Sequence, residues 1–248
     1  MNIYSFNNID TISDFALNLW KKIAGDSIRD HGFFAVALSG GSTPLNFYRK
    51  LSVALGNSPI WSSTHIFLAD ERFVPSDHKD SNLKSIRGNL ISHLKIPDEN
   101  IHALACENHT IESFQKEYEE DIKDLIKAPE GELPSFDLIV LGIGEDGHTA
   151  SLFPEEIRLP STNRAVITSF PTNAAYKRIS LSMELINSAN NIIFIVTGSK
   201  KAKVVREILE GKEKSLPAAL VNPVHGIVYY LLDKDAAREL EGTGINIL

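Results

Sequence analysis

Cysteine is nearly absent from this sequence, since Cys106 is the only one among 248 residues. A single cysteine excludes an internal disulfide and cannot form a cysteine-based zinc site by itself. This cysteine content fits a cytosolic protein.

Long apolar runs and clusters of basic residues are also missing. No apolar stretch approaches the roughly 20 residues of a membrane-spanning helix, and the first residues lack the basic start and apolar core of a signal peptide. Lys and Arg total 25 against 32 Asp and Glu, which gives a formal net charge of -7. We therefore expect a cytoplasmic protein with no nucleic-acid partner and no membrane partner.

The chain is long enough to bury a full core and is near the upper size of one α/β domain, so we expect a single domain over residues 1–248. Apolar segments rich in branched residues alternate with segments of helical spacing. Strands are expected at residues 33–38, 65–69, 136–141, 165–168, 178–182, 191–197 and 226–232. Helices are expected at residues 9–28, 45–51, 83–94, 111–127, 183–189, 204–209 and 234–240. This alternation predicts an α/β fold with a doubly wound, mostly parallel sheet and helices on both faces.

Residues 141–154, LGIGEDGHTASLFP, follow the expected strand 136–141 and form the centre of the candidate site. Gly142, Gly144 and Gly147 permit positive φ and the close approach of a ligand. Among them stand Asp146 and His148, a carboxylate and an imidazole two residues apart. Active sites of α/β proteins are built in this way at the carboxyl ends of strands.

A second glycine turn, SGGSTP at residues 39–44, joins the expected strand 33–38 to a helix. A hydroxyl cap followed by proline at the first helical position is a signal for a helix start. The N–H groups at such a start bind anions, phosphate above all. The local pattern leaves a plain, well-capped turn equally open, because it matches neither GxxxxGK[ST] nor GxGxxG.

Charged residues follow two further expected strands. Asp70, Glu71 and Arg72 come directly after strand 65–69, and Lys200 and Lys201 follow strand 191–197. Because the carboxyl ends of parallel strands share one edge, these side chains should meet the two glycine turns in one crevice. Arginine and lysine there would hold phosphate oxygens, and a nearby imidazole would act as a general base. The pattern predicts a small phosphorylated substrate.

The role of Asp146 is open between two interpretations. It either orients the imidazole of His148 and stabilises its protonated form, or it caps the turn without a catalytic role. Ser39, Ser42 and Ser151 lie outside any GxSxG motif, so water activated by His148 is the simpler nucleophile.

The other histidines are weaker candidates for catalysis. His78 stands near Asp77 and Asp80, but no HxH or HExxH pattern supports a metal site there, and no metal is expected. Four further histidines have no partner at a useful spacing: His31, His93, His102 and His109.

Taken together, the motifs resemble the 6-phosphogluconolactonase family, whose wider superfamily includes glucosamine-6-phosphate deaminase. The resemblance spans nearly the whole chain and implies the Rossmann-like fold of that superfamily. Its most specific part is the run 142–154. The other matching motifs are residues 39–44 (SGGSTP), 70–75 (DERFVP), His78 with 80–82 (DSN), Gly198 with Lys201 and Ala202, and 216–218 (LPA).

The resemblance implies hydrolysis of 6-phospho-D-glucono-1,5-lactone to 6-phospho-D-gluconate, the second step of the oxidative pentose phosphate pathway, without a metal or organic cofactor. His148 would activate the attacking water, with Asp146 as its partner under the first interpretation above. Arg72 and Lys201 would hold the phosphate with the glycine turn, and Arg178 would contact either the phosphate or the carbonyl oxygen. The expected partner is the sugar-phosphate lactone, and a monomer is expected with an oligomer left open. The implied binding residues are Gly40, Gly41, Ser42, Thr43, Asp70, Arg72, Arg178 and Lys201.

Deaminases of the superfamily share the Asp-Gly-His core, so this core does not separate the two activities. Five residues after the histidine they carry a glutamate that assists opening of the sugar ring, whereas this chain has Phe153, which cannot relay a proton. The lactonase is therefore favoured, and the alternative is a sugar-phosphate isomerase or deaminase of the glucosamine-6-phosphate type. A non-catalytic sugar-phosphate sensor would be expected to lose His148 or Arg72, and both are present. A nicotinamide-dependent dehydrogenase would need a dinucleotide glycine spacing that is missing.

Overall fold

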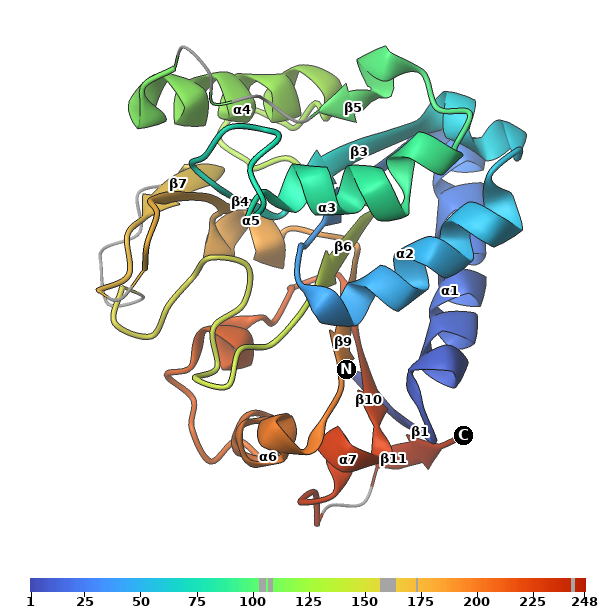
Figure 1. The fold of residues 1–248 in the computed structure, drawn as a ribbon, viewed down its shortest axis with the longest axis vertical. Coiled ribbons are helices and arrows are strands. Elements are labelled where there is room, and N and C mark those ends of the chain that lie inside the picture. The colour runs from blue at the N-terminus through green and yellow to red at the C-terminus, as the bar shows by residue number, and fades with distance from the viewer. Residues whose placement is uncertain (103–105, 107–108, 157–163, 173, 242–243) are drawn as a thin grey trace.

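The computed structural model describes residues 1–102, 106, 109–156, 164–172, 174–241 and 244–248. In these ranges the main sheet has eight strands, all parallel, in the order β11-β1-β10-β9-β6-β2-β3-β5 (Figure 1). Its strands are β1 (Asn2–Phe6), β2 (Phe34–Leu38), β3 (Thr64–Leu68), β5 (Ile101–His102), β6 (Leu138–Leu141), β9 (Asn191–Val196), β10 (Ile227–Asp233) and β11 (Ile245–Ile247). The predicted α/β fold with a mostly parallel sheet is confirmed.

Helices cover both faces of this sheet, as the sequence predicted. Successive residues of the central strand β2 point to opposite faces. Phe34, Val36 and Leu38 pack into the core of one face, and Ala35 and Ala37 into the core of the other. The first face carries α1 (Ile9–His31), α2 (Ser42–Leu55) and α3 (Asn82–Asn89), and the second carries α4 (Ile111–Leu125), α5 (Met183–Asn187), α6 (Ala202–Leu209) and α7 (Lys234–Ala237). In the described ranges no helix combines the length and apolarity needed to cross a bilayer.

Helix α1 illustrates how local sequence fixes an element. The side chain of Asn8 caps its start by accepting from two backbone N–H groups, and Gly32 ends it in the left-handed conformation at φ 92°. Its inward stripe includes Ile12, Trp20 and Ile23, all buried against the sheet. Because full burial of each large apolar side chain contributes about 1.5–3 kcal/mol, this stripe fixes the helix on the sheet.

A smaller antiparallel sheet, in the order β4-β8-β7, stands beside the main one below α4 in Figure 1. Strands β7 (Val166–Ser169) and β8 (Arg178–Leu181) confirm two predicted strands. Residues 70–72 follow the expected strand 65–69 and were not assigned to an element from the sequence. They form a strand of their own, β4 (Asp70–Arg72), because their backbone pairs with β8. This pairing places Arg72 directly opposite Arg178.

Several element boundaries differ from the prediction. Strands β1, β5 and β11 were not predicted, and β11 follows the helix that was expected to be last. The expected helix 83–94 ends earlier, because Leu90 leaves helical geometry at φ -136° and a 3-10 turn, η2 (Ile91–His93), follows. The periodicity of this segment predicts that Leu83, Ile86, Leu90 and Leu94 face inward. The first three are buried, and Leu94 is partly buried against the same core.

Candidate active site

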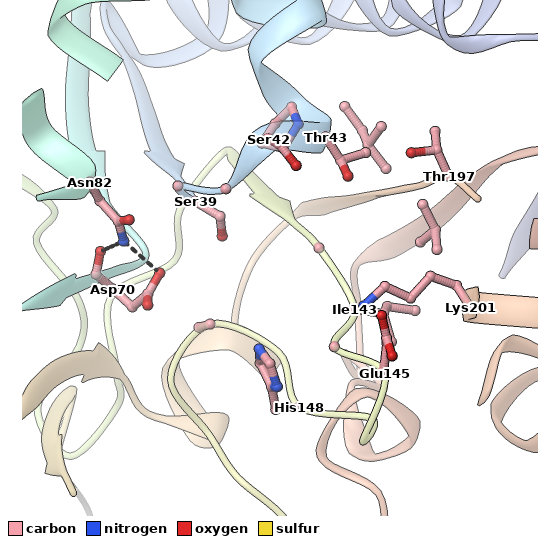
Figure 2. Close-up of a pocket in the computed structure, with 18 of the residues that line it drawn as sticks. Ser39, Ser42, Thr43, Asp70, Asn82, Ile143, Glu145, His148, Thr197 and Lys201 are labelled. Carbon is pink, nitrogen blue, oxygen red and sulfur yellow. Dashed lines mark hydrogen bonds between the residues drawn. The ribbon is translucent and has the colours of Figure 1, made fainter. Parts of the chain in front are cut away.

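A cavity of about 390 Å³ opens where strands β2, β3, β6 and β9 end, as expected for a doubly wound sheet (Figure 2). The wall is formed mainly by polar side chains and glycines. All predicted binding residues lie on it: Gly40, Gly41, Ser42, Thr43, Asp70, Arg72, Arg178 and Lys201. His148 also lies on it. Lys200 is exposed to solvent and is not among the described residues of this wall.

The start of α2 forms one side of the cavity. Gly41 is the N-cap residue at φ 93°, and the helix begins at Ser42 without a side-chain cap. The predicted hydroxyl cap with proline at the first helical position is therefore wrong, because Gly41 takes the cap position and Pro44 is the third helical residue. An uncapped helix start leaves its first N–H groups for a ligand, and its dipole favours an anion.

The loop after β6 positions His148. Its Nδ1 atom lies 2.6 Å from Oδ1 of Asp146, which also accepts the backbone N–H of His148 at 3.2 Å. Gly144 packs under the ring so closely that a Cβ there would lie 2.1 Å from Nδ1. With Nδ1 donating to the carboxylate, Nε2 is the nitrogen available as a base.

The charge state of Asp146 is set by this contact. Burial alone would raise the pKa of Asp146, but the charge of His148 and its hydrogen bonds lower the pKa below the usual range. An ionised carboxylate at this position stabilises the imidazolium that forms when His148 takes a proton. The structure thus brings the predicted pair into direct contact.

Asp70 is held in place by two neighbours. Ser151 donates its hydroxyl to Oδ2 at 2.6 Å. Asn82 donates its amide to Oδ1 at 3.3 Å and to the backbone oxygen of Asp70 at 2.8 Å (Figure 2). Both neighbours are buried, so the carboxylate has a fixed orientation at the cavity wall. The sequence did not single out Asn82 as a site residue, although it lies in the family-like motif DSN.

Arg72 and Arg178 form a cationic pair across strands β4 and β8. Arg72 donates at 2.8 Å to the side chain of Asn82 and to the backbone oxygen of Asp80. Burial lowers the pKa of Arg178, and the positive charge of Arg72 lowers it further. The Nε atoms of both arginines are buried without a hydrogen-bond partner among the described residues. Two adjacent guanidinium groups with spare donors are suited to an anionic oxygen.

Lys201 lies on the opposite side of the cavity from Asp70 and Asn82, near Glu145 and Thr197 (Figure 2). It belongs to a 3-10 turn, η4 (Ser199–Lys201), directly after β9. Burial lowers the pKa of Lys201, while the charges of Glu145 and Asp146 oppose this shift. A bound phosphate would satisfy the partly buried ammonium. Glu145 and Thr197 were not predicted, and only their position beside a strand end pointed to them.

Phe153 closes the gap between the histidine and the arginines. Its ring centroid lies 4.7 Å from that of His148, and the guanidinium carbon of Arg178 lies 5.5 Å from the same centroid. The Phe153 ring therefore contacts the imidazole of His148 and also makes a favourable cation–π contact with Arg178.

The remaining histidines lie outside the cavity wall. His31 contacts Asp137, His102 contacts Asp121, and His109 contacts Glu117. His93 contacts the backbone oxygen of Gly88, and the ring of His78 accepts the N–H of Asp80. Within the described part of the chain, no three side chains of His, Cys, Asp or Glu are grouped to hold a metal ion.

Fold and site together define an α/β protein whose cavity presents cationic groups beside an imidazole–carboxylate pair. Residues 8–230 match the family model described as glucosamine-6-phosphate isomerases/6-phosphogluconolactonase, and the chain belongs to this family.

Similar proteins cover most of the chain. The probable 6-phosphogluconolactonase 1 of Oryza sativa subsp. japonica is 38% identical over 254 residues, covering 96% of this chain and 84% of the relative. The 6-phosphogluconolactonase of Haemophilus influenzae is 38% identical over 209 residues, covering 83% and 87%. The solved structure of 6-phosphogluconolactonase from Trypanosoma brucei has a TM-score of 0.83 at 28% identity, covering 96% and 98%. These matches confirm the resemblance inferred from the motifs.

Proposed function

We propose that this protein hydrolyses 6-phospho-D-glucono-1,5-lactone to 6-phospho-D-gluconate. The observation that carries the proposal is the contact between His148 and Phe153, at the position where deaminases of the superfamily carry an assisting glutamate. A phenyl ring cannot transfer protons to an amino sugar, but a lactonase needs only one base and a stabilised oxyanion. The names of the similar proteins support the same activity.

The phosphate of the lactone binds at Lys201 and the start of α2. The lysine supplies positive charge, and the N–H groups of Ser42 and Thr43 supply donors at the positive end of the helix dipole. This anchoring directs the lactone ring toward His148.

The arginine pair meets the other end of the substrate. The resemblance implies that Arg72 holds the phosphate. Its hydrogen bond to Asn82, which lies on the opposite side of the cavity from Lys201 (Figure 2), favours another role. We therefore assign Arg72 and Arg178 to the carbonyl oxygen at C1. Negative charge develops on that oxygen during attack, and two charged donors stabilise it.

Hydrolysis then needs one proton relay. Nε2 of His148 takes a proton from water while the water oxygen bonds to C1, and Asp146 stabilises the imidazolium. The tetrahedral intermediate collapses with cleavage of the bond between C1 and the ring oxygen. The imidazolium gives its proton to that oxygen, which becomes a hydroxyl group of the opened chain. C1 becomes a carboxylic acid, which ionises.

We further propose that the reaction is the second step of the oxidative pentose phosphate pathway, carried out in the cytoplasm by a monomer without metal or organic cofactor. The single cysteine, Cys106, fits a reducing compartment.

The test is acid release from freshly made 6-phosphoglucono-δ-lactone above the spontaneous background, with and without a chelator. Ammonia release from glucosamine 6-phosphate is measured in parallel on the same protein. Acceleration that a chelator leaves unchanged, without ammonia, supports the metal-free lactonase. No acceleration of lactone hydrolysis, or ammonia release instead, would overturn the proposal in favour of the deaminase-type alternative.

A further inference from the structure

Ser39 carries a buried hydroxyl that the fold does not use. Only 5% of this residue is exposed, and its Oγ atom has no hydrogen-bond partner among the described residues. Its backbone is fully engaged, since its N–H donates to the oxygen of Val140 at 3.1 Å and its own oxygen accepts the hydroxyl of Tyr48 at 2.8 Å. These two hydrogen bonds fix the backbone of Ser39, and the side chain contributes no further hydrogen bond to the described structure.

A buried hydroxyl without a partner costs free energy, and alanine at this position would avoid that cost. The fold therefore gives no reason for a serine here. The cavity does give a reason, because Ser39 lies on its wall and the side chain is directed toward the side that holds Asp70, Ile143 and His148 (Figure 2). The missing partner is thus expected to come from a bound molecule.

We propose that Ser39 recognises a ring hydroxyl of the substrate and is a specificity-determining residue. This inference rests on the proposed function. Ser39 follows β2, which lies between β6, leading to His148, and β3, leading to Asp70. With the phosphate at Lys201 and C1 beside the arginine pair, the middle of the substrate lies against Ser39. A neutral hydroxyl suits the uncharged hydroxyls on C2, C3 and C4 of the lactone.

The test compares Ser39→Ala with wild type on 6-phosphoglucono-δ-lactone and on its 2-deoxy, 3-deoxy and 4-deoxy analogues. Ser169→Ala is the matched control, because Ser169 is also 5% exposed with an unpartnered hydroxyl but lies outside the cavity wall. For wild type, kcat/KM should fall roughly tenfold with one of the deoxy lactones, as expected for one lost hydrogen bond. On the full lactone, the kcat/KM of Ser39→Ala should be lower than that of wild type by the same factor. On that deoxy lactone, Ser39→Ala and wild type should have equal kcat/KM.

Stability separates recognition from a structural role. Ser39→Ala should unfold at the same denaturant concentration as wild type or at a higher one, because no protein hydrogen bond is lost. Ser169→Ala should keep wild-type kcat/KM on every lactone.

Three outcomes would overturn the assignment while wild type still hydrolyses the lactone. The first is that Ser39→Ala and wild type have equal kcat/KM on the full lactone. The second is that Ser39→Ala distinguishes the full lactone from each deoxy lactone by the same ratio of kcat/KM as wild type. The third is that Ser39→Ala loses enough stability to account for its loss of activity. If wild type does not accelerate lactone hydrolysis at all, the proposed function fails and this inference fails with it.

Discussion

Individual side chains in this site gain their chemical character from neighbours fixed by the backbone. The imidazole of His148 is oriented by Asp146, and Gly144 leaves room for the ring where any other residue would clash. Lys201 shows the same dependence, since burial lowers the pKa of its ammonium group and a phosphate would restore it. The arrangement of these groups would therefore suit an anionic ligand without further rearrangement.

The Lys201 assignment predicts a selective defect at the residue scale. Lys201→Met should raise KM for the phosphorylated lactone by about 10- to 100-fold, because a charge-assisted contact with phosphate is lost. Its KM for unphosphorylated gluconolactone should not change. Steady-state kinetics on both lactones measure this contrast.

The neighbouring lysine provides the control. Lys200 is exposed and lies outside the cavity wall of the described structure, so Lys200→Met should behave like wild type. Equal effects of the two substitutions, or an equal effect of Lys201→Met on both lactones, would rule out a specific phosphate contact.

The sequence predicted which residues line the site better than it predicted the contacts between them. His148, Arg72 and Lys201 were found because charged residues that directly follow apolar strands must meet at one sheet edge. The contact of Arg72 with Asn82 was not predicted, because it depends on the path of the nine-residue loop 73–81, for which hydrophobic periodicity gives no information.

At the scale of elements, one buried carboxylate joins β4 to α3. Glu71 accepts the backbone N–H groups of Arg72, Asn82 and Leu83 at 2.7–2.8 Å and the hydroxyl of Ser81 at 3.0 Å. It thereby satisfies free N–H groups at the start of α3, where a negative charge is favoured. The helix start in turn holds Asn82 against the cavity.

Removal of this carboxylate should destabilise the fold. Glu71→Gln replaces one acceptor oxygen with a donor that faces backbone N–H groups, so the free energy of unfolding should fall by about 2–3 kcal/mol. Glu120→Gln is the control, because Glu120 is exposed and forms a surface ion pair with Lys116, worth at most about 1 kcal/mol. Urea unfolding of both variants decides the point, and equal stabilities would show that Glu71 is not a structural link.

Element prediction succeeded where periodicity was strong and failed where segments were short. Strands β6 and β9 are continuous apolar runs and were found, as was α4 with its inward Phe114 and Tyr118. Strands β5 and β11 have two and three residues, and β4 is made of three charged residues that only its partner β8 turns into a strand. Long-range pairing of this kind cannot be read from local sequence.

Across the whole molecule, the candidate catalytic groups gather where strands β2, β3, β6 and β9 end, and a second group of titratable side chains, made of His65, His102 and Asp121, joins β3, β5 and α4. Nδ1 of His65 lies 2.9 Å from Nε2 of His102, whose Nδ1 lies 2.9 Å from both carboxylate oxygens of Asp121. Burial lowers the pKa of His65, the charge of His102 lowers it further, and Asp121 acts in the opposite direction.

This cluster predicts a loss of stability in mild acid. The unfolded chain protonates His65 near its ordinary pKa of about 6.5, whereas the folded chain resists protonation. Since the unfolded state then binds more protons, the free energy of unfolding should fall as pH drops below about 6.5 and be fully restored above it.

Urea unfolding at about pH 8 and pH 5.5 measures this dependence. His65→Gln should reduce the difference between the two pH values. His93→Gln should leave it unchanged, because His93 is exposed and contacts the backbone oxygen of Gly88. A pH dependence that persists undiminished in His65→Gln would assign the effect to other groups.

The proposed hydrolysis depends most on His148 as the base that activates water. The direct measurement is kcat for acid release from fresh 6-phosphoglucono-δ-lactone by His148→Gln beside wild type, with the spontaneous rate subtracted. Loss of a general base should lower kcat by about 10²–10⁴-fold, while the Kd for 6-phosphogluconate and the unfolding midpoint stay near their wild-type values. A His148→Gln protein that keeps the wild-type kcat would contradict the mechanism.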